Sequence, residues 1–449
     1  MTDSTPAPSG TQAAPEPTPS VDEAPLKSLW HNSEFLKFWT GETVSLYGSQ
    51  VTLLALPLTA IYVFHATPEQ VGLLRFLQLV PFLAFAMLFG ALIDRMRRKP
   101  VMMAANLARM LLIGLVPVLA WTNVLRIEPL YVIAFLAGVA TVFFDLSWMA
   151  FVPTMIRDRR LMVEANAKLG ITSSSADAAG PGVAGLLVSA FTAPFAMAVD
   201  AVSYLASLTA LFLIKTPEPR VEKPGGRHLR KELMVGLRFV FGNRHLRAIA
   251  IVGVFCNFFT IGVSTMFIVY AVRDRGVSAA LLGVILSLGA VGGILGAVAA
   301  RPVLRWLPLG AGYRLALGMI FIGPLLIPLA PTSKPVAVTL FVCSFLFVYA
   351  GLGVANVLVQ SLRQNLTPHS LMGRMGAAMR MSLFGGGALG GPVAGAIATW
   401  WGLHTALWVL GLASAAMLVP LMASPVGRLR EMPTEEPELP PSLAKEAVD

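Results

Sequence analysis

The chain has 449 residues, of which 56% are hydrophobic and 13% are charged, and its formal net charge is +10. Soluble domains are typically about 25% charged, so this chain lacks the charge needed to cover the surface of two or three soluble domains. The composition therefore excludes a water-soluble protein and predicts a polytopic membrane protein. The two cysteines lie in apolar stretches and predict packing residues rather than a disulfide framework.

Residues 1–26 are rich in Pro, Ser, Thr, Ala and Glu, a composition that cannot bury a core, so we expect a disordered tail that is not a signal peptide. Twelve apolar runs follow, each close to the roughly 20 residues that cross a bilayer. They are residues 40–64, 69–92, 101–122, 130–152, 167–190, 195–214, 248–271, 279–300, 313–331, 336–360, 377–400 and 404–423. Residues 425–449 form a second polar tail, which we also expect to be disordered.

These runs predict helices, because lipid offers no partner to unpaired backbone groups and the runs lack the alternation of barrel strands. The longest connection, residues 215–247, is rich in Lys, Arg, Pro and Gly and predicts a cytoplasmic basic linker. It separates an N-terminal six-helix bundle, residues 27–214, from a C-terminal six-helix bundle, residues 248–424. The predicted fold is an all-α membrane protein with twelve transmembrane helices.

The distribution of Lys and Arg predicts the orientation of these spans. If the N-terminus is cytoplasmic, only four of the 34 Lys and Arg residues lie on the far side and two lie within spans. The remaining 28 then lie on the cytoplasmic side, which predicts that both termini are cytoplasmic in a cell (inner) membrane. The net charge is thereby explained by topology and by anionic lipid headgroups rather than by nucleic acid.

The two bundles contain a weak internal repeat. The segment Gly180-Pro181-Gly182-Val183-Ala184-Gly185 corresponds to Gly391-Pro392-Val393-Ala394-Gly395, 211 residues later. Pseudo-symmetric membrane halves are typical of transporters, whose binding site lies between the halves near the midplane. Small residues also let helix backbones approach closely, which predicts a packing motif in each half. Its members are Gly180, Pro181, Gly185, Gly391, Pro392 and Gly395.

The loop after the second run, residues 90–99, resembles the G-x-x-x-D-R-x-G-R-R/K signature of the major facilitator superfamily. The match covers Gly90, Asp94, Arg95, Arg98 and Lys99, whereas Arg97 replaces a glycine. The resemblance implies a conformational latch made by Gly90, Asp94, Arg95 and Arg98. It also implies that the packing motif of the repeat lies between the bundles, because in this superfamily spans five and eight, and two and eleven, meet across the halves. Asp94 would meet an arginine or a helix N-terminus in the outward-open state and release it as the halves rock. The alternative is an anchor that only sets topology.

Further motifs resemble the secretion-effector branch of that superfamily, which includes enterobactin exporters and macrolide-efflux proteins. They are Phe143-Phe144-Asp145, Pro153, Glu164-Ala165-Asn166, Asp200-Ala201-Val202-Ser203-Tyr204 and Gly236-Leu237-Arg238-Phe239-Val240. The chain departs from the branch at Ser49, where an Asp is frequent. It also lacks, in the fourth run, the basic residue of the drug-antiporter arginine motif.

Ionisable residues inside spans are costly and therefore mark candidate functional sites. No Asp or Glu lies between Arg275 and Arg430, so a titrating carboxylate must come from the N-terminal half. We expect Asp177, Glu42 and Asp145 to be the candidates for proton coupling. The alternatives are a packing role for Asp177 and an interfacial charge at Glu42.

Matched depths on adjacent helices predict a buried ion pair between Arg109 and Asp145. For Asp200 we expect helix capping or a polar contact near the outer surface. Arg75 either attracts an anionic group or extends to the membrane surface, and the second interpretation is favoured. Four polar residues at membrane depth are candidates for lining the cavity: Gln78, Asn257, Asn356 and Gln360.

Together these features predict a secondary active transporter, a proton-coupled exporter of small amphipathic molecules such as antibiotics or siderophores. An uptake carrier or facilitator without proton coupling is the alternative. No His-Glu-x-x-His, Cys-x-x-Cys or phosphate-loop motif is present, so we expect neither an enzyme nor a bound cofactor or metal. The expected energy source is the proton gradient, and the expected partners are the substrate and membrane lipid, with a monomeric protein.

Overall fold

The computed structural model of the chain describes residues 29–93, 95–156, 158–216, 218, 229–368 and 371–433. These residues form an all-helical structure. Its helices are η1 (Leu29–His31), α1 (Ser33–Phe64), α2 (Pro68–Ile93), α3 (Arg98–Trp121), α4 (Ile127–Met155), α5 (Arg159–Phe191), α6 (Ala193–Leu213), α7 (Leu229–Gly242), α8 (Arg244–Arg273), α9 (Ala279–Trp306), α10 (Leu309–Ile322), η2 (Gly323–Leu326), α11 (Lys334–Asn365), α12 (Met372–Trp401), α13 (Leu403–Ala416), α14 (Leu418–Met422) and η4 (Val426–Arg428).

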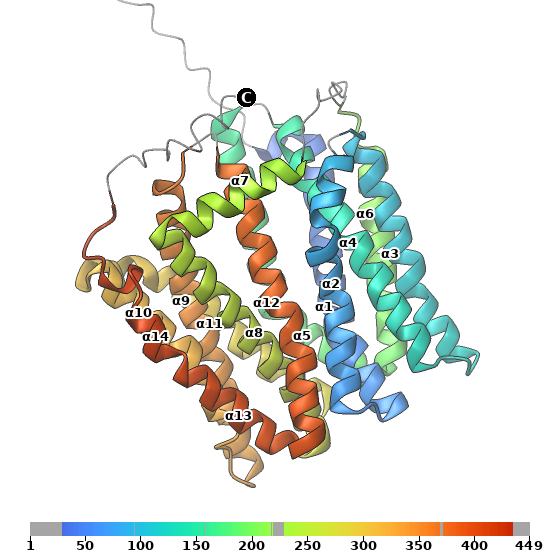
Figure 1. Cartoon of the computed structure of the whole chain (residues 1–449). Coiled ribbons are helices and arrows are strands. Elements are labelled where there is room, and N and C mark those ends of the chain that lie inside the picture. The colour runs from blue at the N-terminus through green and yellow to red at the C-terminus, as the bar shows by residue number, and fades with distance from the viewer. Residues whose placement is uncertain are drawn as a thin grey trace, which may run out of the picture.

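Ten helical segments in the described part of the chain are long and apolar enough to cross a membrane. They are α1, α3, α4, α6, α8, α9, α10 with η2, α11, α12, and α13 with α14. Helices α2 and α5, which are 26 and 33 residues long, run beside them (Figure 1). The twelve-span, two-bundle architecture predicted from the apolar runs is therefore present.

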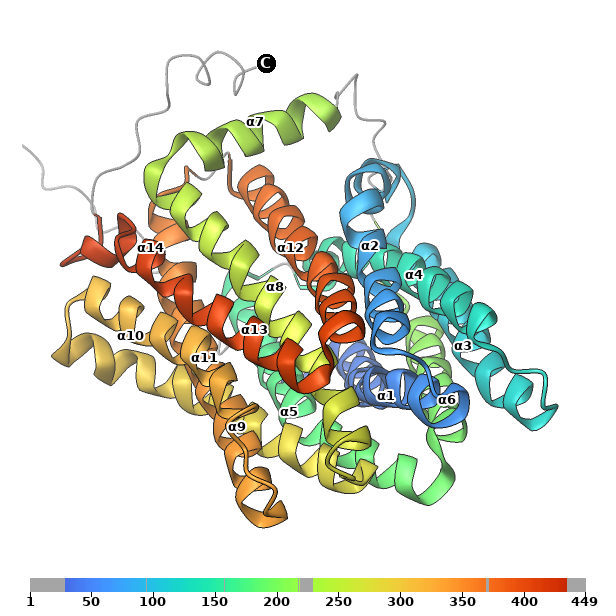
Figure 2. The ribbon, with the colours of Figure 1, turned by 60° about the horizontal axis from the view of Figure 1, so that its bottom comes forward.

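Helices α1–α6 form one half and α8–α14 the other, and α2 and α5 of the first half pack against α12 and α9 of the second (Figure 2). Helix α7 lies across one end of the second half, where α1 also begins (Figure 1). We call this end of the molecule the α7 face and the other end the opposite face. The predicted linker, residues 215–247, includes α7, whose side chains Val235, Phe239 and Val240 are buried.

The apolar core is continuous at the opposite face and divided at the α7 face. One buried cluster joins both halves and includes Leu58 of α1, Val188 of α5, Phe267 of α8 and Ala398 of α12. Toward the α7 face each half has a cluster of its own. The ribbons of α1 and α12 also move apart from each other toward the α7 face (Figure 1). The halves are thus held together at the opposite face.

Of the two polar tails predicted to be disordered, the structure describes only a part of the second. Residues 1–26 lie outside the described residues. Of the second tail, residues 425–433 are described, and they pack against α10: Val426 is fully buried, and the backbone N–H of Gly310 donates to the carbonyl of Leu429 at 2.7 Å. The prediction was wrong for this part, because Val426 is apolar and Gly310 has no side chain to keep the chain away.

Candidate functional site

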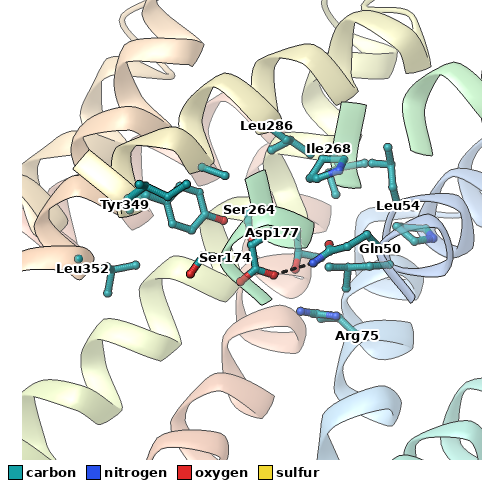
Figure 3. A pocket seen from close by; sticks show the side chains of 18 of the residues that line it. Gln50, Leu54, Arg75, Ser174, Asp177, Ser264, Ile268, Leu286, Tyr349 and Leu352 are labelled. Atoms are coloured by element: carbon teal, nitrogen blue, oxygen red, sulfur yellow. Dashed lines mark hydrogen bonds between the residues drawn. The ribbon is translucent and has the colours of Figure 1, made fainter. Parts of the chain in front are cut away.

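A cavity of about 580 Å³ lies between the two halves (Figure 3). Its walls come from α1, α2 and α5 on one side and from α8, α9 and α11 on the other. The first wall carries most of the polar groups: Gln50, Arg75, Gln78, Ser174 and Asp177. The second wall is mainly apolar, although Ser264, Thr265, Tyr349 and Asn356 contribute polar atoms.

Asp177 is the one carboxylate among the described residues that line this cavity. It lies near the middle of α5, and its Oδ1 accepts a hydrogen bond from Nε2 of Gln50 at 2.6 Å. Gly180 explains this geometry, because its missing side chain leaves space for the stem of Gln50 between α5 and α1. The repeat motif therefore helps to position the partner of Asp177.

Arg75 also lines the cavity, so the favoured interpretation that it extends to the membrane surface is wrong. Its Nη1 donates to Oε1 of Gln78 at 3.0 Å, one helical turn further along α2. Tyr349 of α11 contributes a hydroxyl from the other half (Figure 3). The cavity thus holds one guanidinium and one carboxyl, both supplied by the N-terminal half.

Of the four polar residues predicted to line the cavity, two line it and two do not. Gln78 and Asn356 are lining residues. Asn257 and Gln360 are both described but are not among the residues lining this cavity. The side chain of Asn257 donates back to the carbonyl of Gly253 at 3.0 Å within α8.

A second group of polar and ionisable residues lies inside the N-terminal half, away from the cavity; its members are buried except Asp145, which is half-buried. We call Glu42, Asn106, Arg109, Asp145, Asp200 and Tyr204 the buried polar cluster. The charge of Arg109 acts on all three carboxyl groups of this cluster. Oε2 of Glu42 is buried without a hydrogen-bond partner.

The predicted ion pair between Arg109 and Asp145 is not formed: the pair is absent from the ion pairs within 4.0 Å that join described residues. The Arg109 guanidinium lies instead 4.2 Å from the ring centre of Phe144 and 4.6 Å from that of Tyr204. It also donates to the side chain of Asn106. Two aromatic rings and an amide oxygen therefore contact the guanidinium, and the Asp145 carboxylate does not.

Asp200 makes polar contacts, one of the two roles expected of it, but it is fully buried inside the bundle rather than capping a helix. It accepts hydrogen bonds from the hydroxyls of Thr52 and Ser203. Close by, the hydroxyls of Ser49 and Tyr204 are 3.1 Å apart. Ser49 of α1, which occupies the position where the secretion-effector branch often has an Asp, is thus linked to the buried polar cluster.

Charges from both halves act on Asp145. The positive charges of both Arg109 and Arg380 act on it, and Arg380 belongs to α12. Nη1 of Arg380 also lies 2.7 Å from the sulfur of Met149, one turn further along α4. Arg380 was missed in the sequence, although a charged residue inside an apolar run is a recognisable signal.

The glycines of the repeat motif lie at close contacts between the halves, except Gly180, which packs against Gln50 of its own half, so the inter-bundle prediction is wrong for that residue. Gly185 packs against Ala279 and Gly283 of α9, and Gly283 packs against the carbonyl of Pro181. On the other side, Gly391 and Gly395 contact Gly72 and Pro68 at the start of α2, and Pro392 adjoins the Gly72 contact. Both sets lie toward the opposite face. Nearby, the Arg273 guanidinium of α8 donates to the carbonyl of Ala66 at 2.6 Å.

The loop that carries the latch motif is only partly described. Gly90 lies in the last turns of α2, Arg95 is exposed after the helix, and Asp94 lies outside the described residues. The backbone N–H groups of Arg98 and Lys99, at the start of α3, each donate to Glu218 at 2.8 Å. Glu218 was missed in the sequence, because a carboxylate that caps a helix from a distant segment leaves no local pattern.

The described residues contain no group of three His, Cys, Asp or Glu side chains that can hold a metal ion.

The comparisons with known proteins agree with the fold. The chain is 26% identical over 404 residues to the multidrug efflux pump Tap of Mycolicibacterium fortuitum, covering 86% of this chain and 93% of that protein. It is 27% identical over 438 residues to the enterobactin exporter EntS of Escherichia coli, covering 91% and 96%.

Among solved structures, the nucleoside transporter NupG superposes with a TM-score of 0.70 at 13% identity, covering 87% of this chain and 98% of that one. At this identity the likeness concerns the fold alone. The sequence profile of the Major Facilitator Superfamily matches residues 38–390, which is most of the chain. The chain therefore belongs to the Major Facilitator Superfamily of membrane transporters.

Proposed function

We propose that this transporter is a proton-coupled exporter of small amphipathic molecules such as antibiotics or siderophores. It works by alternating access in the cell membrane, with the α7 face and both termini on the cytoplasmic side. In the conformation described here, the halves converge at the outer face and diverge toward the cytoplasm. A substrate can then enter the cavity from the cytoplasm and leave when the glycine contacts at the outer face separate.

The observation that carries this proposal is the position of Asp177 on the cavity wall. A carboxyl between the halves meets each side of the membrane in turn as the halves rock, so it can release a proton to one side and collect it from the other. Its Oδ1 accepts a hydrogen bond from Gln50, and an ionised carboxylate has further acceptor sites for a donor of the substrate. A donor group of the substrate and a proton would compete for the same oxygen, and this competition couples their opposite movements.

The walls of the cavity support an amphipathic substrate. Polar groups gather on the wall of the N-terminal half, and aliphatic side chains such as Leu286, Ile294 and Leu352 line the other wall. One charge crossing a potential of 100 mV gains about 2.3 kcal/mol, so one inward proton can sustain an outward gradient. The relatives Tap, a multidrug efflux pump, and EntS, an enterobactin exporter, support this direction.

The test uses inverted membrane vesicles that contain the protein, so that export appears as uptake. Radiolabelled macrolide, catecholate siderophore and cationic dye are added with and without an imposed proton gradient. We expect gradient-driven uptake of at least one probe, its collapse by a protonophore, and its loss in Asp177→Asn. The matched control is Asp274→Asn, because Asp274 follows α8 at the outer face and is not among the described cavity residues.

Uptake that survives both the protonophore and Asp177→Asn would contradict proton coupling and favour the alternative, an uptake carrier or facilitator. Equal losses in Asp177→Asn and Asp274→Asn would show that any lost carboxylate impairs the protein. A loss confined to Asp177→Asn, with normal amounts of protein in the membrane, would place the coupling in the cavity.

A further inference from the structure

Arg75 is a cation at membrane depth that has no acidic partner. Among the described residues, no carboxylate oxygen lies within 4.0 Å of its guanidinium. Its one hydrogen bond within the described part of the chain goes from Nη1 to Oε1 of Gln78, a neutral amide. A guanidinium has five N–H donors in a planar fork. Most of these donors are therefore free to meet whatever occupies the cavity.

The surroundings of Arg75 keep its head in the cavity. A Cβ atom added to Gly391 of α12 would lie 3.3 Å from Cβ and 3.6 Å from Cγ of Arg75, so the arginine stem passes directly against this glycine. Gly72, one turn earlier on α2, packs against the backbone of the same glycine. This contact places the backbone of α12 against the base of the Arg75 side chain, and Arg75 lines the cavity.

A charge at membrane depth is costly unless a ligand, water or another charge compensates it. Arg75 nevertheless lines the cavity, and the opposite wall supplies aliphatic side chains. We propose that Arg75 is the binding site for an anionic oxygen group, such as a carboxylate, on the transported molecule. Its fork binds two oxygens at once, and the apolar wall takes the body of the molecule.

Two groups with different chemistry thus lie on the same wall of the cavity. Asp177 is engaged by Gln50 and accepts donors, whereas Arg75 is engaged by Gln78 and donates to acceptors. A molecule with an acidic group and a separate hydroxyl or amine can use both. The inference rests on the proposed function only in that the transported molecule binds in this cavity, and it does not require that transport be coupled to protons.

The test compares two probes that differ only in charge: tritiated 1-naphthylacetic acid and tritiated 1-naphthylacetamide. Equilibrium binding to the purified full-length protein in detergent is measured by scintillation proximity. Because charge-assisted bidentate pairs are about twice as strong as neutral ones, we expect the wild type to bind the acid at least about tenfold more tightly than the amide. Arg75→Gln should remove that preference and leave amide binding within about twofold, and Arg75→Lys should keep part of it.

The unchanged binding of the amide shows that Arg75→Gln is folded and that its cavity is intact. Arg126→Gln, which removes an exposed arginine at the outer face, is the matched control and should leave both affinities unchanged. Equal binding of acid and amide by the wild type, no saturable binding of the acid, or equal effects of Arg75→Gln on both probes would overturn the inference. If the acid preference holds but the protonophore leaves transport unchanged, only the proposed proton coupling fails.

Discussion

The contact between Gly185 and Gly283 predicts how one methyl group would change the conformational equilibrium. A Cβ atom added to Gly283 would lie 3.0 Å from Cα of Gly185 and would collide with the carbonyl oxygen of Pro181. The obstruction is backbone, which cannot rotate away, so α5 and α9 must separate. Overpacking of this kind costs about 1–3 kcal/mol.

That cost applies only while the opposite face is closed, because α5 and α9 must part there for the cavity to open. Gly283→Ala should therefore favour the conformation open at the opposite face by about 5- to 150-fold, the factor that corresponds to 1–3 kcal/mol. The matched control is Gly170→Ala in α5, the helix on the other side of this contact, because a Cβ atom at Gly170 meets no heavy atom within 4 Å.

Double electron–electron resonance can measure the shift directly. Nitroxide labels are attached through Glu128→Cys and Thr332→Cys, which are exposed at the opposite face on different halves, in a background with Cys256→Ser and Cys343→Ser. We expect a longer distance to gain population in Gly283→Ala but not in Gly170→Ala. Distance distributions that match those of the parent, in a variant that keeps its thermal stability, would refute the reasoning.

Three further predictions concern single side chains outside the cavity. Glu218→Ala should destabilise the detergent-purified protein by about 0.5–2 kcal/mol in thermal unfolding, because α3 loses the cap on its first N–H groups; an unchanged melting temperature would contradict that role. Arg109→Met should cost about 3–5 kcal/mol and Arg109→Lys less, because a buried carboxyl cluster loses its cation; equal melting temperatures for both variants and the parent would contradict the cation's role. Arg380→Gln should slow transport without lowering thermal stability, because the charge that acts on Asp145 across the halves is lost, and Arg430→Gln should leave the transport rate unchanged.

The candidate site was predicted only in part, and particular residues show why. The depth of Asp177, Gln78 and Asn356 in apolar runs is a property of the sequence, and the structure places all three on the cavity wall. Asn257 lies at a similar depth but turns back onto its own helix. Depth along a helix is readable from the sequence, whereas the direction in which a side chain points depends on neighbouring helices.

Arg109 illustrates the same limit for pairs of residues. Matched depths on α3 and α4 suggested Asp145 as its partner, but Phe144, one residue earlier, and Tyr204 of α6 flank the guanidinium. A rotation of α4 by one residue, about 100°, separates these two outcomes. Periodicity does not resolve such a rotation, because these helices are apolar over most of their surface.

The sequence by itself determined that the chain lies in a membrane, that it has two pseudo-symmetric halves, and that every acidic residue at membrane depth belongs to the first half. These properties follow from composition and from the distance a helix must cover to span lipid. Only the tertiary structure decided that Arg75 lies in the cavity, that Arg380 of α12 reaches Met149 of α4, and that Glu218 caps α3. Each of these depends on helices distant in the chain approaching within a few ångströms, and glycine contacts such as Gly391 against Arg75 set those approaches.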